Sequence, residues 1–347
     1  MSEAAVRQAF AEQADVCAKL GSPFTGMLCG VLGHVLDRSS RVGGRVLDWR
    51  GLPDALHDNV PLRLTGGLHA LVRSGRANAL AALYPPASLP EEHRLATAVS
   101  QTLLSEDAAL LPWLDRTPQT NEVGRSAVLM SGLLEIASRF PLPLRLYELG
   151  ASAGLNLQLD KYGYALGGTK FGDRNSPLQL EPLWQGASPP DADLRIVSRV
   201  GVDRDALDAR RDGDLLLAYV WPDQPERLER LKVALAIAKS NPPRVERGDA
   251  AEWLKQTLSL EPEAGVTRVV LHSIAFQYFA LDTQRRVRTH IKKVGAAANE
   301  NAPLAWLRFE MLPEDRKPSL RLRAWPGDER LLAWAHPHGT SVEWLEA

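Results

Sequence analysis

The chain has 347 residues, with 41 basic and 42 acidic side chains, a formal net charge of -1 and 45% hydrophobic residues. This hydrophobic fraction is typical of a folded globular protein and argues against wholesale disorder. The nearly neutral charge gives no electrostatic reason to expect an obligate nucleic-acid partner or an anionic membrane partner.

The two cysteines, Cys17 and Cys29, are too few for a disulfide framework, and no His/Cys cluster has the spacing of a zinc site. Charged side chains interrupt the first 20 residues, so we expect no signal peptide. No stretch approaches the ~20 uninterrupted apolar residues that cross a bilayer. We therefore expect a cytoplasmic protein without a bound metal.

The chain up to about residue 119 has the apolar spacing of helices and is predicted to form a helical N-terminal cap domain. Helices are expected over residues 3–20, 27–36, 68–83 and 91–104. We interpret Gly43-Gly44 as a break and Gly66-Gly67 as the segment before a helix. A further helix over 123–137 is expected to be capped by Thr120 or Asn121.

From residue 141 onward, strand and helix patterns alternate. Strands are expected over 142–149, 195–202, 267–272 and 304–311, with a short one ending near 248. Helices are expected over 154–161, 250–258, 282–297 and 215–239, although 215–220 is compatible with a strand. Residues 163–193 read as an irregular insertion with a short strand near 178–183, and strands over 320–325 and 330–335 flank a turn. The pattern predicts an α/β fold over residues 120–347, with a Rossmann-like, mostly parallel sheet and an antiparallel C-terminal hairpin.

The most informative segment is the glycine loop, residues 150–154, which follows a buried strand and precedes a helix. The strand ends in Glu148, and the turn runs through Gly150, Ser152 and Gly154. Small residues let the backbone approach a ligand, and a helix N-terminus offers unpaired N–H donors. Ligands of open α/β sheets bind at the carboxyl ends of the strands, so the loop predicts a site for a nucleotide-like cofactor.

This pattern resembles the class I S-adenosylmethionine-dependent methyltransferases, in which an acid at the end of the first strand precedes Gly-x-Gly-x-Gly. Here Ser152 stands where that family has its middle glycine. The chain is also similar to a bacterial family catalogued only as a domain of unknown function, family 2332. That similarity lies in residues 119–125, the glycine loop, residues 220–224 and His272-Ser273, and it implies no reaction.

The methyltransferase resemblance implies a methyltransferase-type domain that binds S-adenosylmethionine. Glu148 would orient the methionine amino group, Asp203 would accept hydrogen bonds from the ribose, and Asp249 would meet the adenine amino group. An acid at a strand end can instead cap the following helix, and this alternative stays open for Asp203 and Asp249. The cofactor-binding candidates are Glu148, Gly150, Ser152, Gly154, Asn156, Asp203, Asp249 and Ala250.

His272, at the end of the fourth strand, is the first candidate for a base or for a group that orients the methyl acceptor. Tyr278 is the second catalytic candidate. A structural role for His272, a helix-capping role for Asn121 and a core position for Trp221 are the alternatives. The substrate-binding candidates are Asn121, Glu122, Arg125, Trp221, Ser273 and Gln277.

The expected function is transfer of a methyl group to an oxygen or nitrogen of a small molecule. One alternative is a non-catalytic module that binds the same cofactor or acts as a scaffold. Another is an α/β serine hydrolase, because residues 150–154 also fit Gly-x-Ser-x-Gly with Ser152 as nucleophile and His272, His290 or His336 in the triad. Chain order disfavours the hydrolase, since almost nothing before residue 144 has the pattern of a strand.

Overall fold

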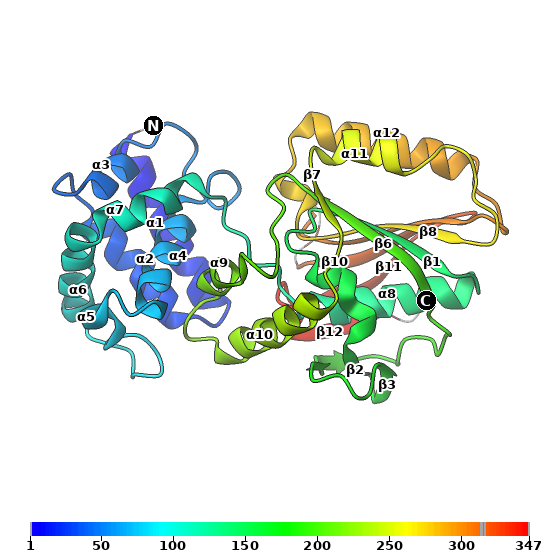
Figure 1. The fold of residues 1–347 in the computed structure, drawn as a ribbon, viewed down its shortest axis with the longest axis horizontal. Coiled ribbons are helices and arrows are strands. Elements are labelled where there is room, and N and C mark those ends of the chain that lie inside the picture. Colours follow the sequence, from blue (N-terminus) through cyan, green and yellow to red (C-terminus); the bar gives the residue numbers. More distant parts are fainter. Residues whose placement is uncertain (1, 313–314, 316, 346–347) are drawn as a thin grey trace. The chain divides into compact units, whose positions relative to one another are not determined.

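The computed structural model describes residues 2–312, 315 and 317–345. The chain divides into two compact units. Figure 1 shows the chain with colours that follow the sequence. The helical unit contains Met1–Thr120 and Asp212–Glu229, and the sheet unit contains Asn121–Arg211 and Arg230–Ala347. The sequence pattern assigned residues 212–229 to the second domain, whereas in the structure they are part of the helical unit.

The helical unit is built almost entirely from helices, whose buried faces form one apolar core. Among the described residues, no helix of the protein is long and apolar enough to cross a membrane. The elements of this unit are α1 (Glu3–Lys19), α2 (Pro23–Val35), α3 (Arg41–Leu47), α4 (Val60–Arg73), α5 (Asn78–Ala81), α6 (Glu92–Ser105), α7 (Asp107–Leu110), the 3-10 helix η1 (Leu111–Asp115), α9 (Gly213–Ala218) and the start of α10 (Pro225–Ser240).

Two glycine pairs lie inside helices. The interpretation of Gly43-Gly44 as a break and of Gly66-Gly67 as the segment before a helix is therefore wrong. Gly43-Gly44 belongs to α3, and Gly66-Gly67 belongs to α4. A Cβ atom added at Gly66 would come within 2.6 Å of the Tyr219 ring, and one at Gly67 within 2.9 Å of the Trp113 ring. These two glycines therefore let aromatic side chains pack directly on the helix backbone.

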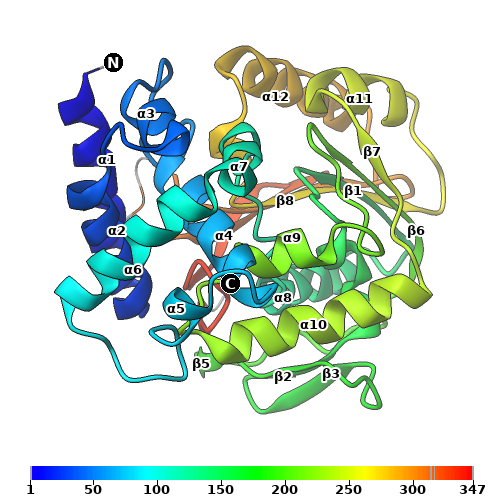
Figure 2. The same cartoon turned by 60° about the vertical axis from the view of Figure 1, so that its left-hand side comes forward.

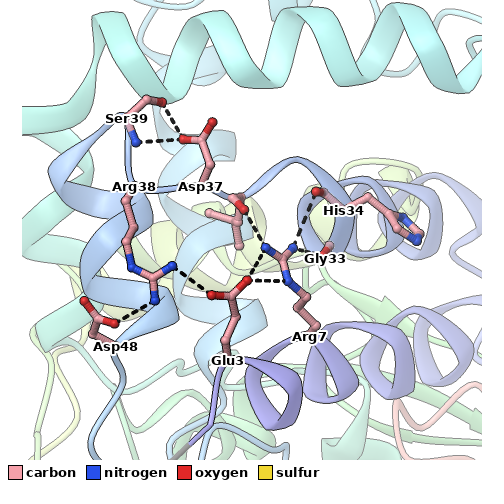
Figure 3. Close-up of polar contacts among 9 residues, drawn as sticks. Glu3, Arg7, Gly33, His34, Asp37, Arg38, Ser39 and Asp48 are labelled. Atoms are coloured by element: carbon pink, nitrogen blue, oxygen red, sulfur yellow. Dashed lines mark hydrogen bonds and ion pairs between the residues drawn. The ribbon is translucent and has the colours of Figure 1, made fainter.

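A polar network joins the start of α1 to the end of α2, as Figure 3 shows. The Arg7 guanidinium donates to the carbonyl oxygens of Gly33 (2.5 Å) and Leu36 (2.9 Å) and forms an ion pair with Glu3 (2.7 Å). Arg38 donates to the other oxygen of Glu3 at 2.8 Å. Arg7 therefore satisfies carbonyl groups at a helix C-terminus that have no partner within the helix.

The segment that returns to the helical unit is tied to it by side-chain caps. The Asp223 carboxylate accepts from the Ser22 hydroxyl and from the Phe24 N–H (2.8 Å) at the start of α2. The Gln224 amide donates to the Leu20 carbonyl at the end of α1 (2.9 Å). Trp221 is buried. The Trp-Pro-Asp-Gln segment thus docks residues 212–229 onto the first two helices.

The sheet unit contains a nine-stranded sheet in the order β5-β12-β11-β10-β9-β8-β1-β6-β7. Pairing is parallel from β7 through β9, and β10 and β11 form an antiparallel hairpin. This confirms the α/β class and the mostly parallel sheet with a C-terminal hairpin. The strands are β1 (Leu144–Leu149), β5 (Leu183–Gln185), β6 (Ile196–Asp203), β7 (Val245–Arg247), β8 (Thr267–Ser273), β9 (Leu304–Glu310), β10 (Ser319–Trp325), β11 (Glu329–Ala335) and β12 (Ser341–Trp344).

The insertion is more regular than expected. It contains a small sheet of β2 (Gly163–Leu166), β3 (Thr169–Gly172) and β4 (Gln179–Leu180), and it also supplies β5 to the edge of the main sheet. β5 pairs in parallel with β12, a strand that the sequence pattern did not indicate. These strands are two to four residues long, too short for a clear alternation of apolar residues.

The parallel strands give the sheet a defined ligand-binding position. Counted from the β7 edge, these strands lie in the order β7, β6, β1, β8, β9. The chain forms them in the order β1, β6, β7, β8, β9. The chain therefore proceeds from β1 to one side and later returns to the other side at β8. In open α/β sheets, ligands bind at the carboxyl ends of the two strands where this reversal occurs. Here those ends are Leu149 and Ser273.

Helices cover both faces of this sheet (Figures 1 and 2). α11 (Ala250–Thr257) and α12 (Leu281–Ala296) run side by side over one face, where Tyr147 and Leu149 belong to their core. α8 (Arg125–Arg139) packs on the other face, with Gly132 against Leu307. Because side chains alternate along a strand, Glu148 points to the face that α8 covers.

Candidate functional site

The glycine loop is a tight bend with three residues in the left-handed region. Gly150 has φ 73°, Ser152 has φ 54° and Gly154 has φ 72°. A Cβ atom at Gly150 would lie 2.6 Å from the Ala275 Cβ, and one at Gly154 would lie 2.8 Å from Pro243. Glycine is therefore required at both positions, for its conformation and for the space it leaves.

The N–H groups of this loop are not available to a ligand, contrary to the expectation from the sequence. Gly150 and Ala151 donate to the Val202 carbonyl, and Gly154 donates to the Ala151 carbonyl. The remaining N–H groups, those of residues 152, 153 and 155, donate to side chains from outside the loop. All six donors from 150 to 155 are thus used within the protein, and a cofactor would have to be held by other groups.

Asn121 supplies two of those hydrogen bonds. Its side-chain oxygen accepts from the N–H groups of Ala153 (3.1 Å) and Leu155 (3.2 Å), and its own φ is 37°. α8 begins at Arg125 after Gly124, without a side-chain cap. The expected capping of this helix by Thr120 or Asn121 is therefore wrong, because the Asn121 side chain holds the glycine loop instead.

Glu148 is the most unusual group at this end of the sheet. Glu148 is only 1% exposed, and its Oε2 atom has no hydrogen-bond partner among the described residues. Burial raises the pKa of the Glu148 carboxyl well above its usual range, the nearby Asp203 raises it further, and Arg125 opposes the shift. An ionised carboxylate in this position is costly unless a donor or a cation joins it.

Asp203 ends the neighbouring strand and shares this environment. Oδ2 accepts from the Ser152 N–H (2.8 Å) and Oδ1 from the Asp205 N–H (2.9 Å). Burial raises the pKa of Asp203, and the two N–H donors partly lower it again. A carboxylate has about four lone-pair positions, so both oxygens keep the capacity to accept a further hydrogen bond.

A buried network connects the start of α8 to the strand ends. Arg125 donates to the carbonyl oxygens of Ser273 and Pro337, both at 2.9 Å. The Ser126 hydroxyl donates to the Asn156 side chain at 2.7 Å. Segments around residues 121–126, 150–156, 273 and 337 are therefore in direct contact. The sequence pattern pointed to the first three of these segments, but it gave no signal for Ser126 or for the Pro337 carbonyl.

Glu122, another predicted substrate-binding residue, is buried beside this network. Its Oε1 accepts from the Gly124 N–H at 3.0 Å. A Cβ atom at Gly124 would collide with the His338 carbonyl oxygen, which fixes the loop between β11 and β12 against the start of α8. Glu122 thus stabilises the turn that leads into α8.

His272 does not have the geometry of a general base. It is 1% exposed; its Nδ1 lies 2.6 Å from Glu310 Oε1, and the Trp306 indole N–H donates to its Nε2 at 3.1 Å. An indole N–H can only donate, so Nε2 must accept, and the hydrogen-bond network assigns a neutral ring with its proton on Nδ1. Both ring nitrogens are engaged. This arrangement gives no support to the predicted base role, and it fits the structural alternative for His272.

Glu310 extends this cluster to the loop after β8. Its Oε1 also accepts from the N–H groups of Ala275 (3.0 Å) and Phe276 (3.1 Å). Ala275 in turn faces Gly150. The His272–Glu310 pair thus fixes a loop that contacts the glycine loop. Neither Glu310 nor Trp306 was expected at the site, because both lie in the apolar pattern of β9.

The loop after β8 is conformationally strained. Ile274 has φ 45°, which is rare for a β-branched residue and costs roughly 1–3 kcal/mol. Among the described residues, four non-glycine positions have positive φ, and Asn121, Ser152 and Ile274 are three of them. All three lie in the contacting segments of this site. Such strain clusters at functional sites, which supports a ligand-binding role for these segments.

Gln277 and Tyr278 follow in the 3-10 turn Phe276–Tyr278. Gln277 is half-buried, whereas Tyr278 is 52% exposed. The described contacts give Tyr278 no position against the buried acids, so its predicted catalytic role has no support from the geometry.

Three predicted residues have structural roles elsewhere. Asp249 caps α11, because Oδ1 accepts from the N–H groups of Ala251 and Glu252, and Oδ2 accepts from the Thr283 hydroxyl (2.8 Å). The capping alternative therefore describes Asp249. Ala250 is the buried first residue of that helix. Trp221 belongs to the helical unit.

The histidines considered for a hydrolase triad have other partners. His272 is engaged as described, and a ring nitrogen of His290 lies 2.8 Å from the Leu258 carbonyl oxygen. Nδ1 of His336 accepts from the His338 N–H at 3.2 Å. These contacts do not favour Ser152 as a catalytic nucleophile.

A hollow of about 210 Å³ adjoins the glycine loop at Ala153. Its other walls come from the loop after β6 and from the segment that precedes β7. No group of three or more His, Cys, Asp or Glu side chains in the described part of the chain has the arrangement of a metal site. The lining residues are Ala153, Ala206, Leu207, Asp208, Ala209, Arg210, Arg211, Ala238, Pro242, Pro243 and Val245.

These features define an α/β protein with a separate helical unit and a polar, strained cluster at the reversal point of its parallel strands. The chain belongs to a family described as uncharacterized proteins conserved in bacteria (DUF2332), whose model matches residues 7–344. No curated protein matches the chain. The family membership expected from the sequence is thus confirmed.

Proposed function

We propose that the sheet unit binds S-adenosylmethionine and transfers its methyl group to an oxygen or nitrogen of a small molecule. One observation carries this proposal: Glu148, at the end of β1, has a buried carboxyl oxygen without a hydrogen-bond partner among the described residues. A protonated amino group would bring a positive charge and up to three N–H donors to that oxygen. The methionine part of the cofactor carries such a group.

The other acid at this edge fits the same ligand. Asp203 keeps lone pairs that would accept hydrogen bonds from the ribose hydroxyls, in addition to the two N–H groups that it already binds. The absence of side chains at Gly150 and Gly154 keeps the bend compact. This assignment differs from the sequence expectation, because side-chain carboxylates rather than loop N–H groups would bind the cofactor.

The bound cofactor supplies an electrophilic methyl group. The chain would contribute mainly by positioning the two reactants, which in favourable cases accounts for ~7–11 kcal/mol of a barrier. His272 would not accept a proton, because both of its ring nitrogens are engaged. Its part would be to fix, through Glu310, the loop at Ala275 that contacts Gly150.

The same observation on His272 favours a second candidate, a non-catalytic protein that binds this cofactor. Both ring nitrogens of His272 are engaged, Tyr278 is about half exposed, and the two buried acids are assigned to the cofactor. In this case the cofactor would bind at Glu148 and Asp203 without turnover.

Calorimetry with S-adenosylmethionine and S-adenosylhomocysteine tests the binding. Glu148→Met should weaken binding by at least about tenfold, since hydrogen bonds to charged groups contribute ~1.5–3 kcal/mol each. Asp193→Asn is the control, because this acid is also in the sheet unit but its side chain is 82% exposed. An absence of heat with both compounds contradicts the proposal. Release of S-adenosylhomocysteine in the presence of acceptor molecules separates the enzyme from the non-catalytic protein.

A further inference from the structure

Two arginines lie side by side at the opposite, amino-terminal end of the sheet. Arg145 of β1 and Arg268 of β8 are register partners on adjacent parallel strands. Arg268 is only 1% exposed and is the largest fully buried side chain among the described residues. The positive charges of two neighbouring guanidinium groups repel each other, so the pair needs a compensating negative charge.

The Arg268 guanidinium is held in one orientation. Its Nη1 donates to the carbonyl oxygens of Ser259 (2.8 Å) and Glu261 (3.1 Å). Its Nε and Nη2 are buried and have no hydrogen-bond partner among the described residues. These two nitrogens form one edge of the planar guanidinium, which is the edge that binds two oxygens of a carboxylate or phosphate at once.

Arg145 adds a third donor of the same kind. Its Nε is buried without a partner among the described residues, while Nη2 forms an ion pair with Glu263 at 2.9 Å. Arg145, Arg268 and Glu263 together leave one positive charge. A guanidinium cannot relieve its burial by losing its proton, so a buried arginine requires an anion or several hydrogen-bond acceptors.

We propose that Arg268 and Arg145 form a binding site for one small oxyanion, either a phosphate or a carboxylate group. The Nε–Nη2 edge of Arg268 binds two oxygens of the anion, and Nε of Arg145 donates to it from the neighbouring strand. Residues 259–266, which contact both arginines, are exposed along most of their length, so the site lies just beneath a surface segment. This site is independent of the cofactor proposed at Glu148, which lies at the other end of β1.

Calorimetric titration of the full chain with inorganic phosphate, and separately with acetate, tests the proposal at constant ionic strength. We expect saturable binding of at least one of the two anions. Binding of phosphate alone identifies a phosphate site, and binding of acetate as well identifies a site for carboxylates. No saturable binding of either anion overturns the proposal.

Arg268→Lys keeps the charge but removes the two-donor edge, and it should weaken binding at least about tenfold. Arg285→Lys is the matched control, because Arg285 is a 77% exposed arginine of α12. If Arg268→Lys does not fold, Arg145→Lys should show the same loss, since it removes the third donor. Equal affinities in the control and in the folded Arg268 or Arg145 variant overturn the proposal.

Discussion

Glu148 shows how a single residue can be costly for the fold and suited to a ligand. Its carboxyl is buried at the end of β1, and one oxygen lacks a partner among the described residues. Because burial raises its pKa, the folded chain binds a proton there more tightly than the unfolded chain. Stability contributed by this group therefore falls as the pH rises above the pKa of the unfolded chain, ~4.3, toward the higher pKa of the folded state.

Glu148→Met should stabilise the protein in the absence of ligand at pH 8, by about 1–3 kcal/mol, because an apolar side chain of similar volume replaces a buried acid. The gain should nearly disappear at about pH 3, where the acid is protonated in both states. Urea unfolding of both proteins across this pH range measures the difference. A variant that is less stable than the wild type at pH 8 would contradict the assignment of Glu148 as an uncompensated acid.

Trp306 fixes the tautomer of His272, because its indole N–H donates to Nε2. We expect the His272 ring of the wild type to carry its proton on Nδ1, because Nε2 accepts from the indole. Trp306→Phe removes the donor, leaves a buried nitrogen without a partner and should cost about 1–3 kcal/mol. Nitrogen NMR of the ring reports the tautomer, and a wild-type ring with its proton on Nε2 would disprove the assignment.

At the scale of secondary structure, glycine is the residue whose role was hardest to predict. Gly43-Gly44 and Gly66-Gly67 lie within helices, whereas Gly150 and Gly154 form a bend. Gly66, Gly67, Gly150 and Gly154 have close neighbours from distant parts of the chain, which leave no room for a Cβ atom, whereas an added Cβ at Gly44 would meet no atom within 4 Å. Local sequence contains no information on these neighbours. It predicted the bend at residues 150–154, but it did not place the two glycine pairs inside helices.

Gly67→Ala should destabilise the helical unit although alanine is the better helix former. The added methyl group would meet Trp113 at 2.9 Å and Leu110 at 3.1 Å, and overpacking of this kind costs roughly 1–3 kcal/mol. Gly30→Ala in α2 is the control, since no atom lies within 4 Å of its added Cβ. That variant should gain ~1 kcal/mol from helix propensity. Thermal unfolding distinguishes the two, and equal shifts would contradict the packing argument.

The site shows the same limit of prediction. Glu148, Gly150, Ser152 and Gly154 were found because an apolar strand, an acid and small residues follow one another in the sequence. Glu310 and Trp306 were missed because they belong to a strand whose seven residues are all buried. Their roles depend on His272 of the neighbouring strand, and such pairing across a sheet leaves no local pattern.

For the whole molecule, the alternation of strands and helices was sufficient to predict the class and the parallel sheet. It did not reveal that residues 212–229 belong with the first 120 residues, since α9 and α10 read like any helices between two strands. The contacts responsible are those of Tyr219 on Gly66 and of Asp223 on the start of α2.

A fragment of residues 1–120 should therefore lack cooperative unfolding, because the Tyr219 ring and the Asp223 cap are missing. Residues 1–120 joined to 212–229 by a flexible linker should restore a cooperative transition. Circular dichroism during heating compares the two proteins. A cooperative transition in the shorter fragment would show that the returning segment is dispensable.

The discontinuous helical unit also sets an order of events during synthesis on the ribosome. Residue 229 is made 109 residues after residue 120, a delay of roughly 5–20 s at bacterial translation rates. For most of that interval the nascent chain exposes the surface of α4 that Tyr219 later covers, and β1 and the glycine loop are made within it. The first 120 residues thus lack part of their core until residue 229 has been made, and during this interval their exposed apolar surface is open to aggregation.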